Sequence, residues 1–169
     1  MAKTKYLLKY HELYHQRIQE LKSRVRELKE SLGPEEFSRH ETVKLAVRIR
    51  EAEKEVEDDP NRPEYLLHDE LRKFRRYKRG LGRYRIIFCF SSKPPIVIFL
   101  YLNTAETLRK AGSRQDPYER FKAMLRRGEV SHDPSDPKTK KWIVAQEDGG
   151  GRKKKPGQRS PRSSEPQRS

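Results

Sequence analysis

Over the first third of the chain, apolar residues recur three and four positions apart, as they do along one face of an α-helix. The first series consists of Ile18, Leu21, Val25, Leu28 and Leu32. This spacing predicts a helix over residues 6–31, which the pair Gly33-Pro34 ends.

A second series of the same kind consists of Leu45, Ile49, Ala52 and Val56. It predicts a helix over residues 34–57, because Pro34 suits a first helical turn and acidic residues follow it there. Together the helices predict an antiparallel hairpin over residues 6–57, with Leu28 and Ile49 packed inside one domain. A coiled-coil dimer is the alternative, although the apolar stripes are short for one.

In the middle of the chain the pattern changes to short apolar runs between turns. Residues 58–63, which contain two prolines, are predicted to form a loop. Strands are then expected at residues 71–78, 83–90 and 96–101. The turn "GLG", residues 80–82, and the close spacing predict an antiparallel meander. The third strand is apolar on both faces and is therefore expected at the centre of the sheet.

A last helix is predicted over residues 117–127, with Asp116 as its N-cap, and residues 142–144 could add a short strand. The whole pattern predicts an α+β fold, a small antiparallel sheet with an N-terminal helical hairpin and a C-terminal helix. We expect one domain over residues 1–146, with the sheet and the active site within residues 70–128.

The remaining residues, 147–169, are rich in Gly, Lys, Arg, Ser and Pro and are predicted to be a disordered basic tail. No stretch approaches the roughly 20 apolar residues of a membrane span, so we expect a cytoplasmic protein without membrane contact. The single cysteine, Cys89, falls within a predicted strand, where a small buried hydrophobic residue is its expected role.

Charge changes this picture, because the net charge of +15 is concentrated in one block. Residues 72–127 contain 16 Lys and Arg against 3 Asp and Glu, whereas residues 1–71 contain 14 against 16. Such a block repels itself, and a bound polyanion would relieve the repulsion.

Within this block, tyrosines are interleaved with the arginines. A guanidinium group pairs with phosphate and a tyrosine ring stacks on a base, so the composition is typical of a nucleic-acid-binding face. Charge that protects a sheet edge is the alternative, but one or two lysines are enough for that purpose.

No metal site or cofactor is predicted. His11 and His15 would share a helix face, but no third ligand follows them, and we expect both at the surface. A two-metal nuclease needs a cluster of carboxylates, which the basic block lacks. Cleavage of RNA would then use the 2′-hydroxyl as nucleophile, arginines to stabilise the phosphate charge, and Lys or Tyr for proton transfer.

Two stretches, "FRRYKRGLGRYRIIFCFS" and "YLNTAETLRKAGSRQDPYERFKAMLRRG", resemble the YhaV family of bacterial type II toxins, ribonucleases of the RelE-like superfamily. The resemblance implies a small α+β fold, cleavage of ribosome-associated mRNA and arrest of translation. It also implies a neutralising antitoxin of the AbrB-like PrlF class, encoded beside the toxin.

On this basis we expect Arg76 and Arg85 to stabilise the scissile phosphate, and Lys78 and Tyr118 to transfer protons. The residues expected to bind RNA are Arg75, Arg83, Tyr84, Asn103, Arg109, Arg126 and Arg127.

The chain departs from the family pattern at one position of interest. The family often places His directly after "RRG", where this chain has Glu129, and His132 follows three residues later. The role of His132 in proton transfer is therefore open. The same charge block would also serve a non-catalytic RNA- or ribosome-binding protein, which is the alternative function.

Overall fold

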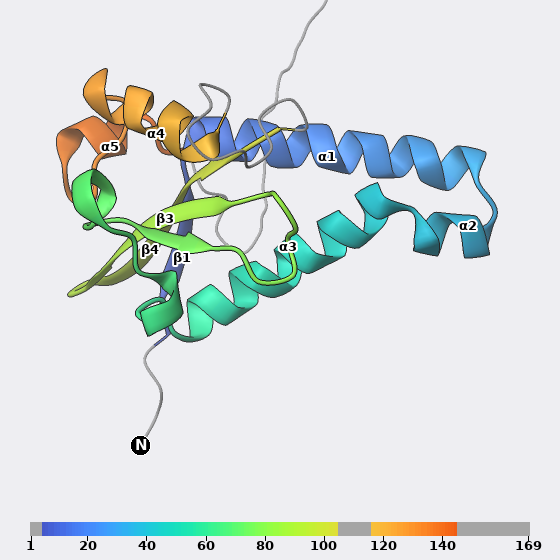
Figure 1. Cartoon of the computed structure of the whole chain (residues 1–169), viewed down its shortest axis with the longest axis horizontal. Helices are drawn as coiled ribbons and strands as arrows, with labels where there is room; N and C mark the ends of the chain where they lie inside the picture. The colour runs from blue at the N-terminus through green and yellow to red at the C-terminus, as the bar shows by residue number, and fades with distance from the viewer. Residues whose placement is uncertain (1–4, 105–115, 145–169) are drawn as a thin grey trace, which may run out of the picture.

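Four strands form one sheet. The computed structural model describes residues 5–104 and 116–144, and its strands are β1 (Leu7–Tyr10), β2 (Arg75–Tyr77), β3 (Ile86–Ser92) and β4 (Pro95–Leu102). They lie in the order β1-β4-β3-β2 (Figure 1). The last three are antiparallel neighbours and β4 is central, both as predicted, whereas β1 is an additional edge strand parallel to β4.

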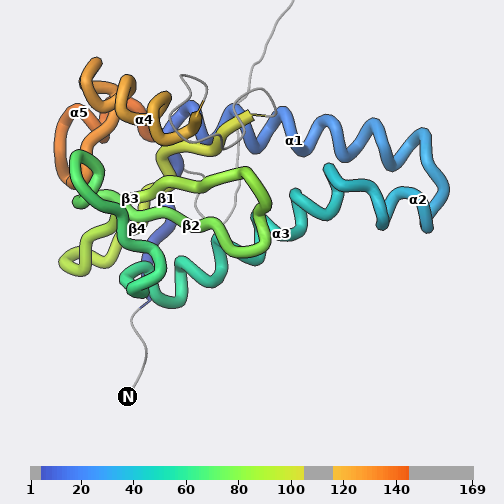
Figure 2. Tube along the Cα trace, in the orientation of Figure 1, coloured from blue at the N-terminus to red at the C-terminus, as the bar shows by residue number. Residues whose placement is uncertain are grey.

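Helices flank this sheet. They are α1 (Glu12–Ser31), α2 (Pro34–Arg39), α3 (Glu41–Asp58), α4 (Pro117–Arg126) and α5 (Pro137–Lys141), with 3₁₀ turns at Pro63–Tyr65 and Asp69–Leu71. The helices α1 and α3 form the predicted hairpin, with α2 at its tip (Figure 2). The predicted α+β class, with an N-terminal hairpin and a C-terminal helix, is confirmed.

Two of the predicted helix boundaries are wrong. The helix expected over residues 6–31 starts only at Glu12, because the residues before it form β1. The helix expected over residues 34–57 is interrupted at His40, where the backbone becomes extended between α2 and α3.

Both long helices begin after a histidine that caps them. His11 Nδ1 accepts a hydrogen bond from Leu13 N, and His40 Nδ1 accepts one from Thr42 N, each at 3.1 Å. Histidine is not among the residues strongly preferred as N-caps, so these starts have a weak signal in the sequence.

The first predicted strand is much shorter than expected. Of residues 71–78, only Arg75–Tyr77 form β2. Before it the chain turns, with Phe74 N donating to Leu71 O at 2.9 Å, and both side chains are buried. Leu71 and Phe74, whose apolar side chains suggested a strand, are therefore core residues that belong to a turn.

The other two strand predictions also need correction. The strand expected at residues 83–90 begins at Ile86 and runs to Ser92. The strand expected at residues 142–144 is reduced to one bridge, between Ile143 and His11. The helix expected over residues 117–127 is confirmed as α4, and the Asp116 side chain caps it.

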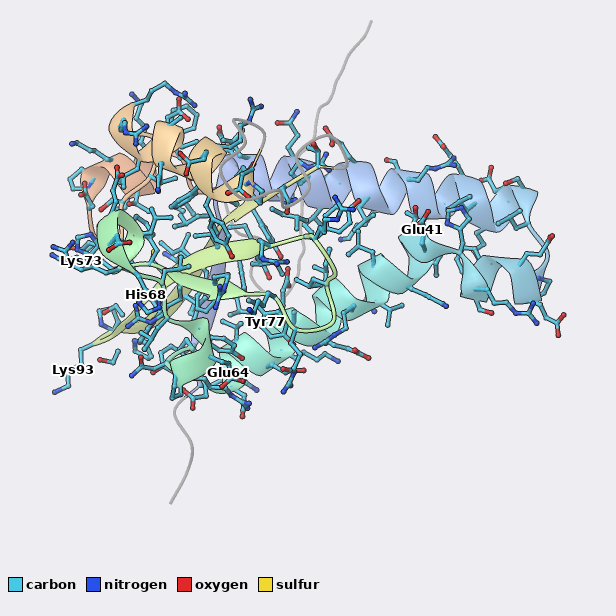
Figure 3. The ribbon with its side chains drawn as sticks, in the orientation of Figure 1. Glu41, Glu64, His68, Lys73, Tyr77 and Lys93 are labelled. Carbon is cyan, nitrogen blue, oxygen red and sulfur yellow. The ribbon has the colours of Figure 1, made fainter. Side chains whose placement is uncertain are left out.

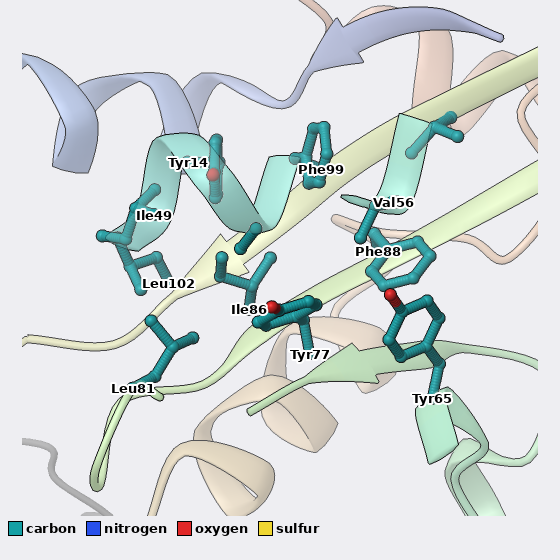
Figure 4. Packing of buried hydrophobic residues seen from close by; sticks show 12 residues of the cluster. Tyr14, Ile49, Val56, Tyr65, Tyr77, Leu81, Ile86, Phe88, Phe99 and Leu102 are labelled. Atoms are coloured by element: carbon teal, nitrogen blue, oxygen red, sulfur yellow. The ribbon is translucent and has the colours of Figure 1, made fainter. Parts of the chain in front are cut away.

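Each face of the sheet carries a hydrophobic core. On the face covered by α1 and α3, the packed side chains include Tyr14, Ile49, Val56, Tyr77, Ile86, Phe88, Phe99 and Leu102 (Figure 4). On the face covered by α4, they include Phe74, Ile87, Cys89, Ile98, Leu100, Phe121 and Met124. Successive side chains of a strand point to opposite faces of the sheet. The pairing of a charged residue with a strand neighbour from one of these cores therefore shows which face it lies on.

Three buried positions agree with the sequence. Leu28 and Ile49, expected inside the hairpin, are 5% and 3% exposed. Cys89 lies in β3, and burial raises the pKa of its thiol above the usual range. Cys89 is therefore a buried apolar residue, as predicted.

Candidate active site

The loop between β2 and β3 turns the most basic part of the chain back on itself. Leu81 N donates to Lys78 O at 3.0 Å, and Tyr84 N donates to Leu81 O at 2.9 Å, so two turns follow one another. Gly80 and Gly82 have φ values of 75° and 61°, a region that glycine adopts without strain. The predicted "GLG" turn is confirmed.

Two guanidinium groups converge on the hydroxyl of Tyr118. Arg76 Nη1 donates to Tyr118 Oη at 3.3 Å, and Arg85 Nε donates to the same oxygen at 3.2 Å. Arg76 comes from β2, Arg85 lies just before β3, and Tyr118 lies in the first turn of α4. Three of the four side chains expected to be catalytic are therefore in contact; we call them the arginine–tyrosine cluster.

Backbone carbonyls hold both arginines in place. Arg76 Nη2 donates to Glu64 O at 3.1 Å, and Arg85 Nη1 donates to the carbonyls of Gly82 and Tyr84 at 2.6 and 2.7 Å. A carbonyl fixes a guanidinium group without cancelling its charge. Among the described residues, no carboxylate forms an ion pair with either arginine. Two fixed, uncompensated charges at one place suit a phosphate group.

Asn103 binds the backbone of the loop that carries Arg85. Its Oδ1 accepts from Arg85 N at 2.7 Å, and its Nδ2 donates to Arg83 O at 3.3 Å. The residue is 1% exposed. Its buried amide links the loop before β3 to the end of β4. The expected contact of Asn103 with RNA stays a prediction.

Arg75, which we expected to bind RNA beside the cluster, lies on the opposite face of the sheet. Its guanidinium group is 5.4 Å from the centroid of the Phe90 ring, which packs against the core on the α3 side, and partial burial lowers the pKa of Arg75. The alternation along β2 separates it from Arg76, the next residue. Its role in RNA binding stays a prediction.

Lys78, the fourth expected catalytic residue, is exposed directly after β2. The residues on either side of Lys78, Tyr77 and Arg79, are both bound by Glu55 of α3. Tyr77 Oη and Arg79 Nη2 each donate to Glu55 Oε1 at 2.8 Å. Arg48 also donates to Tyr77 Oη, and Figure 3 shows Tyr77 where β2 lies against α3. This support was missed from the sequence.

Glu55 has no distinguishing signal in the sequence, because it is one of six acidic residues between positions 51 and 59. In the structure its carboxylate has a lowered pKa. Burial opposes the shift, but the hydrogen bond from Tyr77 and the charges of Arg79 and Arg48 outweigh it. Glu55 is thus ionised and ties the basic loop to the hairpin.

The remaining expected RNA-binding residues lie around the cluster or outside the described residues. Arg83 is exposed and Tyr84 is half-buried in the β2–β3 loop. Arg126 pairs with Glu70 at 3.4 Å, and Arg127 pairs with Glu129 at 2.7 Å, both as exposed side chains in or just after the last turn of α4. Arg109 lies outside the described residues.

Glu129 and His132, which differ from the family pattern, have separate surroundings. The hydrogen bond from Arg127 and the charge of Arg127 lower the pKa of Glu129. His132 is exposed and approaches the Phe74 ring edge-on, with 6.3 Å between centroids. Neither contacts Arg76, Arg85 or Tyr118 by any hydrogen bond in the described part of the chain.

The expectation that His11 lies at the surface is wrong. Besides capping α1, it is 0% exposed, its Nε2 lies 3.0 Å from Glu129 O, and its ring stacks on Trp142 at 5.5 Å. Burial lowers its pKa. His11 therefore joins the start of α1 to the segment after α4. The sequence carries no hint of this role, because His11 falls inside the helix predicted over residues 6–31.

The described residues contain neither a group of metal ligands nor a helix that could span a membrane. No three His, Cys, Asp or Glu side chains among them are grouped as a metal ion would need. None of the described helices combines the length and the apolar character that crossing a membrane requires.

Comparisons with known proteins identify the family. The family described as "Toxin with endonuclease activity, of toxin-antitoxin system" (Toxin_YhaV) matches residues 8–139. The chain is 34% identical over 109 residues to "Ribonuclease toxin YhaV" of Escherichia coli K12, covering 61% of this chain and 69% of that protein. "Toxin YhaV" of Escherichia coli O157:H7 matches with the same identity and coverage. No solved structure shows a significant match.

Proposed function

The chain belongs to the YhaV family of toxins with endonuclease activity from toxin–antitoxin systems, and from this premise we propose that it is an endoribonuclease that cleaves mRNA without a metal ion and thereby inhibits translation. The observation that carries the proposal is the convergence of Arg76 Nη1 and Arg85 Nε on Tyr118 Oη, at 3.3 and 3.2 Å.

In the free protein the Tyr118 hydroxyl oxygen occupies a position that two guanidinium groups can reach. A non-bridging oxygen of a phosphate bound there would accept the same N–H groups and would carry more negative charge. Because backbone carbonyls already hold the Arg85 side chain, little reorganisation is needed when charge develops in the transition state. Arg76 and Arg85 therefore stabilise the scissile phosphate.

The reaction proceeds by attack of the ribose 2′-oxygen on the adjacent phosphorus. The bond from O2′ to phosphorus forms as the bond from phosphorus to O5′ breaks, which leaves a 2′,3′-cyclic phosphate and a 5′-hydroxyl. We propose that Tyr118, whose hydroxyl gives up the two guanidinium N–H groups to the bound phosphate, donates its proton to O5′. Lys78 accepts the proton of the 2′-hydroxyl as the general base.

A cleavage assay tests this reaction. We expect the purified protein to cut a single-stranded mRNA fragment in the presence of excess EDTA and to leave 2′,3′-cyclic phosphate ends. A matched fragment with one 2′-deoxynucleotide at the cut site should be resistant at that bond. Binding of the fragment without cleavage at any protein concentration would instead favour the non-catalytic RNA-binding protein.

We also propose where the protein acts. The antitoxin partner follows from the family, and we propose that this antitoxin is of the AbrB-like PrlF class and that the toxin acts in the cytoplasm on ribosome-associated mRNA. Residues 1–146 would form the toxin domain. Residues 147–169, which lie outside the described residues, would add a weak attraction to RNA through their seven Lys and Arg.

A further inference from the structure

A groove runs between α1 and α3, and none of its lining residues belongs to the arginine–tyrosine cluster. It consists of two adjoining hollows of about 550 and 540 Å³, which share Lys22, Ala46 and Arg50. The apolar residues that line it are Ile18, Leu21, Val25, Phe37, Val43, Ala46, Val47 and Ile49. We call this surface the hairpin groove. Val47, which lines the groove, is 53% exposed, so the apolar lining continues to the protein surface.

The rim of the hairpin groove is basic. Its exposed cationic side chains are Lys22, Arg26, Arg50 and Lys54. In the described part of the chain, none of the four forms an ion pair with a carboxylate.

The two acidic residues of the groove are already engaged. Glu51 pairs with Arg48 at 3.3 Å, outside the groove. Glu53 accepts from Tyr14 Oη at 2.6 Å and from Tyr10 Oη at 3.4 Å. Lys22 and Arg50 lie near enough to Glu53 to act on its charge. The four cations still outnumber the two carboxylates, so the rim keeps an excess of positive charge.

From this combination of an apolar floor and a rim with an excess of positive charge, we propose that the hairpin groove is the docking site for an acidic amphipathic segment of the antitoxin. Apolar side chains of that segment would cover the floor, and its Asp or Glu side chains would lie beside Lys22, Arg26, Arg50 and Lys54. The proposal rests on the toxin–antitoxin assignment, but it does not depend on the cleavage mechanism.

Charge argues against the other occupants. Residues 147–169 follow Val144, which lines one end of the groove, but they contain seven Lys and Arg against three Asp and Glu. A second copy of the chain carries a net charge of +15 and would meet the same repulsion. RNA would suit the rim but would leave the floor of aliphatic side chains uncovered.

Zero-length crosslinking tests which occupant is present. A carbodiimide joins a lysine amine directly to a carboxylate, so Lys22 and Lys54 report on acidic groups in contact with the rim. The full chain is crosslinked alone and with the protein encoded by the neighbouring gene, and the products are identified by mass spectrometry. We expect Lys22 and Lys54 to be joined to Asp or Glu of that protein. Crosslinks instead to Glu147, Asp148 or Glu165, or between two copies of the chain, would overturn the proposal.

Affinity measurements with charge-reversed variants give an independent readout. In the double variant Lys22→Glu/Arg50→Glu, and separately in Val47→Asp, we expect the Kd for the neighbouring gene's product to rise at least ~10-fold. The matched controls Lys29→Glu on α1 and Lys44→Glu on α3 change exposed lysines that do not line the groove, and they should leave the Kd unchanged.

Cleavage of RNA by each free variant is measured in parallel, because it separates this proposal from the proposed function. The groove variants should cut RNA at the rate of the parent. An unchanged Kd in the groove variants, or no binding of the parent to the neighbouring gene's product, would overturn the docking site whether or not RNA is cleaved. Weaker RNA binding with unchanged binding of that product would assign the groove to RNA and would also overturn it.

Discussion

Asn103 Oδ1 accepts a hydrogen bond from the backbone N–H of Arg85 at 2.7 Å. The bond joins the end of β4 to the residue just before β3, which is also the residue whose side chain reaches Tyr118. A buried amide thereby sets the position of one charge in the arginine–tyrosine cluster. We propose that Asn103 is a positioning residue, because it is 1% exposed and its amide oxygen binds the backbone of Arg85.

Replacing Asn103 tests this role. In Asn103→Ala, the N–H of Arg85 loses its partner, and we expect a stability loss of about 1–3 kcal/mol together with a lower kcat. KM and the salt dependence of RNA binding should change little. Asn103→Asp keeps the accepting oxygen and should restore much of the rate. A lower kcat with an unchanged KM in the folded Asn103→Ala protein is the result that a loss of stability alone would not give. Loss of RNA binding in both variants would contradict the positioning role.

A second prediction concerns the arginine that β2 supplies. Losing one preorganised charge donor from a site of this kind typically costs about 100- to 1000-fold in rate, so Arg76→Ala should nearly abolish cleavage and toxicity while RNA binding persists. Lys73→Ala is the control, because Lys73 is an exposed residue of the same basic block (Figure 3). A folded Arg76→Ala protein that arrested growth like the parent would show that Arg76 is only a solvated strand charge.

The tyrosine of the cluster makes a separate prediction. Tyr118→Phe removes the hydroxyl that meets both guanidinium groups and should lower kcat by ~100- to 10,000-fold if that hydroxyl transfers a proton. Tyr6→Phe, which changes a tyrosine packed on Phe90, is the matched control. A small loss of rate with weaker RNA binding would leave Tyr118 with a binding role only.

The sequence was enough to predict some of these residues and not others. Arg76, Arg85 and Tyr118 could be named before the structure, because the resemblance fixes their positions and local turn signals such as Gly82 predict the reversal between them. Arg75 lies on the other face of the sheet from Arg76, because the α3 side of β2 includes Arg75. A strand of only three residues has too few alternating positions for the sequence to show which face packs against α3.

The missed elements have a common cause, which is contact between distant parts of the chain. β1 forms because Leu7 to Tyr10 pair with residues 96–99 of β4, nearly 90 positions away, and Tyr10 also fits the helical spacing with Tyr14. His11 is buried because Glu129 O and the Trp142 ring, more than 100 positions later in the chain, contact its side chain. Local periodicity carries no information on such pairs.

The hairpin interior gives a stability prediction. Ile49 belongs to the core on the α1 and α3 face, whereas Leu28 is buried near the tip of the hairpin. Both alanine variants should lose stability, within the range of about 2–5 kcal/mol for such truncations, with Ile49→Ala toward the upper end. Denaturant unfolding of the free protein measures this. Unchanged stability in both would mean that the hairpin is held together only in a complex.

The last prediction is the pH dependence that Glu55 gives to the basic loop. Its carboxylate accepts from Tyr77 Oη and Arg79 Nη2, each at 2.8 Å, and these interactions, with the charge of Arg48, lower its pKa in the folded protein. A group whose pKa is lower when folded stabilises the protein above its unfolded pKa, about 4.3 for glutamate, and loses that contribution as the pH falls through the folded value. Glu55→Gln should therefore lower Tm at pH 7.

At pH 3 or below, the parent and Glu55→Gln should have nearly the same Tm, because the parent carboxyl is then protonated as well. Glu55 does not touch the arginine–tyrosine cluster, so a fall in kcat at pH 7 would come through Lys78, whose neighbours Tyr77 and Arg79 lose a charged anchor. Glu51→Gln removes a more exposed carboxylate of the same helix, also paired with Arg48, and is the control. A difference in Tm between parent and Glu55→Gln that stayed constant from pH 7 to pH 3 would show that shape, rather than charge, holds the loop to α3.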